Sequence, residues 1–232
     1  MATVPRSVPI EQLSPPFPPE WTLADIQQLL GDIPLNRIAI QPALGSATEF
    51  DVERLHSSSG KLFELEYGIL VEKAMGWYES IIGILVSHAL RTYLDQHDLG
   101  QVLGADGLIK ILPGVVKIPD VCFISWDRFP SERLARTPIP TLIPNLVVEV
   151  LSESNTADEM QKKLHRYFAA GVQLVWYIDP LTRSAISYSS PSNAVRVLPS
   201  ECISAAEILP GFSIQLQALF DKADQQAART KR

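Results

Sequence analysis

Two short apolar runs on either side of a helical pattern constrain this fold more than any other sequence feature. Residues 145–151 (NLVVEVL) are almost wholly apolar apart from Glu149, and residues 172–179 (VQLVWYID) form a second run that Pro180 closes. Apolar runs of this length, bounded by loop signals, are typical of strands buried on both faces of a sheet. Residues 154–170 lie between them and predict a helix, so the chain contains a strand, a helix and a second strand.

The ends of the predicted helices carry recognisable signals. Asn155 or Thr156 can cap the helix over residues 154–170, and Gly171 follows its last turn. Residues 77–97 contain no proline, and their apolar side chains recur every three or four positions. This spacing is typical of an amphipathic helix.

The remaining segments predict one α+β domain with two extensions. Six of the 18 prolines fall within the first 19 residues, so residues 1–33 predict an extended or mobile arm with a short helix over residues 22–30. Residues 62–73 predict a hairpin that turns at Tyr67-Gly68. We expect the domain to span residues 34–216 and residues 217–232 to form a frayed polar tail.

Composition excludes several classes of protein. The chain has 232 residues, of which 46% are hydrophobic and 20% are charged, which is a balance typical of soluble globular proteins. Its net charge of −6 gives no support to a strongly basic nucleic-acid coat or a polybasic membrane anchor, although a local basic groove stays open. No apolar run approaches the roughly 20 residues that cross a bilayer, and the N-terminus lacks a secretory signal. With two cysteines, Cys122 and Cys202, a disulfide framework is excluded, and we expect a cytoplasmic protein.

Two acidic residues stand out because they lie in or beside apolar runs. Glu149 is flanked by apolar residues within 145–151, and Asp120 directly follows Pro119 at the start of another apolar run. A buried carboxylate is usually paired, protonated or bound to a metal. Two carboxylates on adjacent strands can hold a hard divalent cation. The alternative is that each acid pairs with a buried arginine or caps a turn.

Lys163 lies on the helix that follows Glu149. Helical spacing places it on one side with Glu159 and Tyr167. A lysine there can be directed over the end of the preceding strand, where it could orient a water or stabilise charge on a phosphorane. The alternative is a solvated lysine that pairs with Glu159 along the helix, and Lys162 is the more ordinary solvent-facing residue.

Other catalytic patterns are missing. The four histidines do not form a metal-binding set, and no GxxxxGK[ST], GxGxxG or GxSxG motif occurs. The sequence therefore gives no support to a zinc site, a nucleoside-triphosphate site, a dinucleotide site or a serine hydrolase.

Four motifs in order resemble the Uma-two family of restriction-endonuclease-like proteins. They cover residues 63–80 (FELEYGILVEKAMGWYES), 116–124 (VKIPDVCFI), 145–156 (NLVVEVLSESNT) and 159–180 (EMQKKLHRYFAAGVQLVWYIDP). The resemblance spans roughly residues 34–216. It implies the PD-(D/E)xK nuclease core, with a four-stranded mixed sheet flanked by helices, and a metal-dependent phosphodiesterase.

The resemblance also implies roles for particular residues. Pro119-Asp120 matches the PD element and Glu149 matches the second acid, while the lysine expected two positions later is replaced by Leu151. Lys163 matches a lysine that has moved to the following helix. Glu79, at the start of the helix over residues 77–97, resembles a further acid found in many such nucleases, and its alternative is an ordinary exposed helix residue.

This constellation fits magnesium chemistry. Asp120 and Glu149, with the Val150 carbonyl, would hold Mg²⁺ or Mn²⁺, and Lys163 would position the attacking water or stabilise the phosphorane.

Three functions stay open. The first is a DNA endonuclease, for which we expect DNA as a partner and a homodimer that the proline arm could wrap. The second is an inactive nucleic-acid-binding or scaffolding protein on the same fold, which a Lys163 ammonium more than about 8 Å from both acids would favour. The third is a metal-dependent hydrolase of another phosphodiester or small molecule. Because the chain is acidic, its grip on DNA must come from a local groove near Lys162, Lys163 and Arg166.

Overall fold

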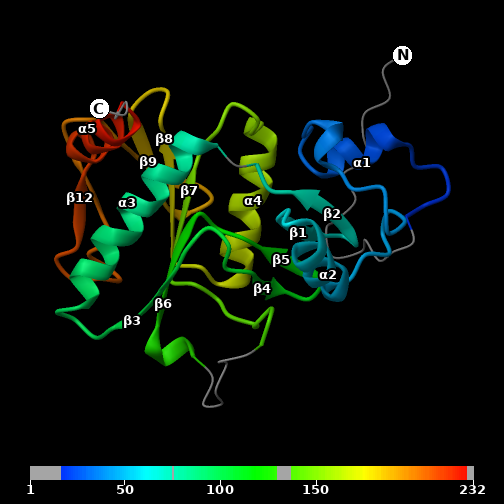
Figure 1. The fold of residues 1–232 in the computed structure, drawn as a ribbon, viewed down its shortest axis with the longest axis horizontal. Coiled ribbons are helices and arrows are strands. Elements are labelled where there is room, and N and C mark those ends of the chain that lie inside the picture. Colours follow the sequence, from blue (N-terminus) through cyan, green and yellow to red (C-terminus); the bar gives the residue numbers. More distant parts are fainter. Residues whose placement is uncertain (1–16, 75, 130–136, 229–232) are drawn as a thin grey trace.

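The computed structural model describes residues 17–74, 76–129 and 137–228. Three sheets and five α-helices make up this part of the chain (Figure 1). The helices are α1 (Leu23–Leu29), α2 (Glu49–Ser59), α3 (Trp77–Leu94), α4 (Ala157–Ala170) and α5 (Leu216–Ala227), with 3-10 turns η2 (Leu35–Arg37) and η3 (Trp126–Arg128). None of the described helices is long and apolar enough to cross a membrane.

A six-stranded mixed sheet, in the order β10-β9-β8-β7-β6-β3, forms the centre of the molecule. Its strands are β3 (Gly100–Leu103), β6 (Val121–Ser125), β7 (Leu146–Val150), β8 (Leu174–Asp179), β9 (Ser184–Ser190) and β10 (Asn193–Val197). β7 and β8 are parallel, and the other neighbours are antiparallel. A parallel pair needs a crossover connection, which α4 supplies, as the apolar runs and caps predicted. The sheet has six strands rather than the four that the resemblance implied.

A smaller antiparallel sheet, in the order β2-β1-β5-β4, lies beside α4 (Figure 1). Its strands are β1 (Phe63–Glu66), β2 (Ile69–Glu72), β4 (Ile109–Leu112) and β5 (Val115–Lys117). The hairpin predicted over residues 62–73 is confirmed. Tyr67 and Gly68 both have positive φ, and a Cβ on Gly68 would lie 2.4 Å from the backbone of Gly45. The turn therefore requires glycine at this position.

The apolar core has separate parts on the two faces of the large sheet. α3 and α5 cover one face, where Leu90, Trp176 and Phe220 are fully buried. α4 covers the other face through Met160, Leu164 and Tyr167. Side chains of β7 alternate between these faces, so one strand serves both.

The expectation that residues 217–232 form a frayed tail is wrong for the residues that belong to α5. Residues up to 228 belong to the ordered fold, because α5 buries Leu216, Leu219, Phe220 and Ala223 against the core. A further short hairpin, β11 (Cys202–Ser204) with β12 (Ser213–Gln215), leads into α5. Residues 229–232 lie outside the described residues.

The N-terminal segment is described from residue 17 onward, so residues 1–16 of the expected arm lie outside the described residues. The short helix is confirmed as α1, and Thr22 and Asp25 form a capping box at its start. Ile26, Leu30 and Ile33 pack against Ile69 and Val71 of β2. This part of the N-terminal segment is therefore attached to the domain.

Candidate functional site

Asp120 and Glu149 lie on neighbouring antiparallel strands of the large sheet. Asp120 directly precedes β6, Glu149 lies within β7, and the register pairs Val121 with Val148. Both acids line one pocket with Lys163 and Val150. The structure therefore brings together four of the positions that the sequence singled out.

Pro119 explains why Val150 is free to take part in this pocket. Continuing the β6–β7 register pairs Val150 with Pro119, which has no N–H to donate. The Val150 carbonyl therefore lacks its ladder donor, and the Val150 N–H is bound at 2.8 Å by Oδ2 of Asp120 instead. The Pro-Asp pair thus ends the ladder and directs one backbone carbonyl and one carboxylate to the same place.

Glu149 is buried in an environment that opposes its charge. The Tyr167 hydroxyl donates to Oε1 of Glu149, and the Lys163 ammonium lies 2.9 Å from the same oxygen. Burial raises the pKa of Glu149 against the pull of Lys163, and the negative charge of Asp120 adds to the rise. Oε2 is therefore the candidate oxygen for an incoming ligand.

Lys163 reaches the site as the resemblance implied. Its ammonium contacts Glu149 at 2.9 Å and Glu64 at 3.1 Å, so the distance criterion that would favour an inactive protein is not met. The alternative pair with Glu159 does not form, because Glu159 binds Arg37. Burial lowers the pKa of Lys163, but Glu149 and Glu64 together raise it well above its ordinary value. Lys163 therefore stays protonated at neutral pH and can act as a cation rather than as a base.

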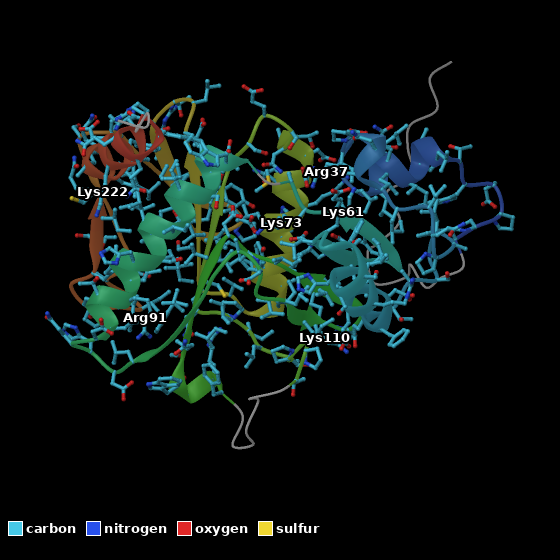
Figure 2. The ribbon with its side chains drawn as sticks, in the orientation of Figure 1. Arg37, Lys61, Lys73, Arg91, Lys110 and Lys222 are labelled. Atoms are coloured by element: carbon cyan, nitrogen blue, oxygen red, sulfur yellow. The ribbon has the colours of Figure 1, made fainter. Side chains whose placement is uncertain are left out.

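Lys73 is a site residue that the sequence interpretation missed. It follows β2, and its ammonium lies 2.9 Å from Oδ1 of Asp120 and 3.2 Å from the carbonyl of Ala105. Figure 2 shows Lys73 near the middle of the molecule, between the hairpin and the large sheet. Its side chain is 4% exposed and lines the same pocket as Asp120 and Glu149.

Glu64 ties the smaller sheet to the site. Its Oε1 accepts the N–H of Ile118 at 3.2 Å and contacts Lys163, while its Oε2 binds Lys117 at 3.1 Å. Burial raises the pKa of Glu64, but Lys117 and Lys163 outweigh it and hold the pKa well below its ordinary value. Glu64 is therefore a buried anion that fixes the segment entering the Pro-Asp pair.

The basic residues expected to contact DNA form ion pairs within the protein. Arg166 is buried, binds Glu66 at 2.7 Å and stacks over Tyr67. Lys163 is held by two acids, and Lys162 pairs with Asp158 along the helix, as an ordinary surface lysine does. Lys163 and Arg166 therefore do not offer unpaired charge to DNA, and the DNA contact expected in a groove near these three residues stays a prediction.

Glu79 is not brought into the pocket. It lies half-buried in the first turn of α3, and a Cβ added at Gly76 would lie 1.8 Å from its Oε2. The carboxylate therefore folds back over the start of its own helix. Gly83, one turn later on the same face, is the residue of α3 that approaches Asp120.

A sequence signal for the missed residues did exist. Glu64 and Glu66 alternate with apolar residues in β1, and Lys117 ends the apolar β5. Charged residues inside short apolar strands predict buried ion pairs. What the spacing could not supply was the identity of their partners, which lie up to 100 residues away.

The donor atoms of the pocket fit a hard divalent cation. Asp120, Glu149 and the Val150 carbonyl present oxygen atoms, which Mg²⁺ prefers, and Mg²⁺ binds with few protein carboxylates. In the described part of the chain, no three His, Cys, Asp or Glu side chains group as metal ligands. A cation here would therefore rest on two carboxylates, one carbonyl and water.

Comparisons with known proteins identify the family and support the fold. The model of the Uma2 family, described as "Putative restriction endonuclease", matches residues 49–217. A protein from Anabaena variabilis, described as "a putative nuclease belonging to DUF820", superposes with a TM-score of 0.63 at 17% identity, covering 71% of this chain and 93% of that chain. At this identity the likeness shows the fold alone. No curated protein matches the sequence.

Proposed function

This chain belongs to the Uma2 family, and from that premise we propose that it is a metal-dependent endonuclease that hydrolyses phosphodiester bonds of DNA. Membership supports a nuclease-type function; the metal, the DNA substrate and catalytic competence are our proposal. The observation that carries it is the meeting of Asp120, Glu149, the Val150 carbonyl and the Lys163 ammonium around one pocket.

Asp120, Glu149 and Val150 would hold Mg²⁺ or Mn²⁺. A bound divalent cation at such a site makes water more acidic and offsets charge on a phosphate. Because Pro119 has no N–H, the Val150 carbonyl has no ladder donor and is available to a cation. The Val150 N–H donates to the Asp120 carboxylate and fixes its position.

Lys163 would act as a fixed cation. Its protonated ammonium can orient the attacking water or stabilise negative charge on the phosphorane. Glu64 positions Lys163 directly, by binding its ammonium, and Tyr167 positions it indirectly, by binding Glu149, the other partner of Lys163. Glu64 and Tyr167 are therefore positioning residues.

A non-catalytic role on the same fold has one observation in its favour. Each site carboxylate already has a lysine partner, so the described site is internally paired without a metal. We place this alternative second, because Lys163 reaches the position that catalysis requires.

DNA cleavage tests the proposal directly. Purified full-length protein should nick supercoiled plasmid or cut single-stranded DNA with Mg²⁺ or Mn²⁺, and Glu149→Ala and Lys163→Ala should each lose about 100-fold or more of that rate. Hydrolysis of bis(p-nitrophenyl) phosphate alone would instead favour a hydrolase of small phosphodiesters. The proposal would be contradicted if the protein cleaved none of these substrates in the presence of Mg²⁺ or Mn²⁺.

We further propose a cytoplasmic homodimer, because two active sites suit the two strands of a duplex. Light scattering that gives a monomer mass would contradict the dimer.

A further inference from the structure

Lys73 holds one of the two carboxylate oxygens of Asp120. Asp120 has two carboxylate oxygens, and Oδ2 is taken by the Val150 N–H at 2.8 Å. The Lys73 ammonium lies 2.9 Å from the other oxygen, Oδ1. A cation that coordinates Asp120 through Oδ1, or through both oxygens, would therefore compete with the Lys73 ammonium for that oxygen.

We propose that Lys73 is a built-in competitor of the divalent cation: its ammonium holds Asp120 when the cation is absent and gives up that oxygen when the cation binds. This inference rests on the proposed function, since it assumes that a divalent cation uses this pocket. It adds a residue that sets metal affinity and that is not part of the Pro-Asp, Glu149 and Lys163 constellation.

Charge balance supports competition. The buried or nearly buried acids in and beside the pocket are matched in number by cations: five acids (Glu64, Glu66, Asp120, Glu149 and Glu159) face five cations (Arg37, Lys73, Lys117, Lys163 and Arg166). A divalent cation adds two positive charges to a network in which acids and cations are already equal in number. Because charge is expensive to hold in a poorly hydrated site, one resident cation must move away from its acid.

Lys73 is the buried lysine of this network best able to move. Lys163 and Lys117 are each held by two carboxylates. Lys73 has one carboxylate, Asp120, and one neutral carbonyl, that of Ala105 at 3.2 Å. Its partners are therefore the weakest in charge among these buried lysines.

The backbone of Lys73 is anchored, so the movement involves its side chain. Its N–H donates to the carbonyl of Leu62 at 2.8 Å, which continues the β1–β2 ladder. A lysine side chain has a flexible four-carbon stem, so its ammonium can leave Oδ1 and remain beside the pocket.

Metal binding, measured without turnover, tests the competition. Mn²⁺ alone is titrated into the full-length protein by calorimetry for the wild type, Lys73→Met and Lys73→Arg. We expect Lys73→Met to bind Mn²⁺ about tenfold more tightly or better, because the competing charge is gone, whereas Lys73→Arg keeps a cation and should stay within about threefold of the wild type.

Three further variants make the result specific. Lys61→Met removes the same charge from an exposed ion pair with Glu72 and should leave Mn²⁺ affinity within about twofold of wild type. In an Asp120→Asn background, Lys73→Met should no longer tighten binding. Lys73→Gln, which removes the charge but keeps a hydrogen-bond donor, replaces Lys73→Met if the latter does not fold.

The outcomes separate this inference from the proposed function. If the wild type binds Mn²⁺ and Lys73→Met or Lys73→Gln binds it equally or more weakly, competition is refuted while the metal site stands. If neither the wild type nor any variant binds Mn²⁺, both proposals are refuted. A purely structural Lys73 would lower thermal stability without tightening Mn²⁺ binding.

Discussion

The two faces of the large sheet are buried by different means. Towards α3 and α5, the strands present apolar side chains such as Val148 and Trp176. Towards α4, the same strand β7 presents Glu149, which is held by Lys163 and Tyr167. One face is therefore held by packing and the other by packing together with a network of charges.

This difference indicates where function is to be sought. Burying ion pairs gives little net stability, because desolvation offsets most of the attraction. A fold that needed only stability could cover both faces with apolar side chains. The charged face lies between α4 and the smaller sheet, and it contains the residues that the family resemblance marks as catalytic.

The largest effect should come from the apolar face. Phe220→Ala should lower the free energy of unfolding by about 3–5 kcal/mol, because it leaves a cavity under α5. Urea unfolding measures this loss, and Mn²⁺ affinity of the folded protein should not change. Leu181→Ala, at a side chain that is 85% exposed, is the control and should change stability by less than about 0.5 kcal/mol. A loss below about 1 kcal/mol for Phe220→Ala would mean that α5 does not seal this face.

On the charged face, removing one cation should leave its carboxylate partners buried without that counter-charge. Lys117→Met should lower the free energy of unfolding by about 3 kcal/mol, because Glu64 and Glu66 lose a shared partner while staying buried. Lys61→Met, in an exposed pair, should lose at most about 1 kcal/mol. Equal losses for the two variants in urea unfolding would remove the distinction between buried and surface pairs.

Acid should destabilise the charged face selectively. Burial raises the pKa of Glu66, but Lys117 and Arg166 outweigh it and hold the pKa below its ordinary value of 4.5. A lowered pKa contributes stability that is present above about pH 4.5 and is lost as the pH falls through the folded-state pKa. Urea midpoints measured from neutral pH down to about pH 3 should therefore fall less steeply for Glu66→Gln than for the wild type. An identical slope would show that Glu66 does not keep its charge in the fold.

The smallest effect concerns the start of α4. Thr156 accepts the N–H of Glu159 at 3.0 Å, and its hydroxyl donates to the carbonyl of Gly31. Thr156→Ala should lower the free energy of unfolding by about 1 kcal/mol. Thr156→Ser keeps the hydroxyl and should therefore stay close to the stability of the wild type. If the two variants unfold at the same urea concentration, the hydroxyl does not cap α4.

The sequence predicted the strand–helix–strand centre well, because its signals are local. Apolar runs define β7 and β8, and Thr156 and Gly171 bound α4 where capping rules place them. The meeting of Asp120, Glu149, Val150 and Lys163 followed from matching the motifs of a family. Spacing alone left a solvated Lys163 open, and the structure excludes that alternative.

What escaped prediction depends on partners distant in sequence. Lys73 is informative only beside Asp120, and Arg166 seemed a free cation until Glu66 was placed against it. α5 is a different case, because Leu216, Leu219, Phe220 and Ala223 have helical spacing that its polar composition concealed. Its apolar stripe could have been found from the sequence.

The central claim is that the charged face is a metal-dependent hydrolytic site, and plasmid cleavage by one variant from each face tests it most directly. The rate per folded molecule in Mn²⁺ is compared for wild type, Lys163→Met and Phe220→Ala, below the unfolding temperature of each. The prediction is that Phe220→Ala cuts like the wild type while Lys163→Met loses about 100-fold or more. Cutting by Lys163→Met at the wild-type rate, or no metal-dependent cutting by the wild type, would contradict the claim.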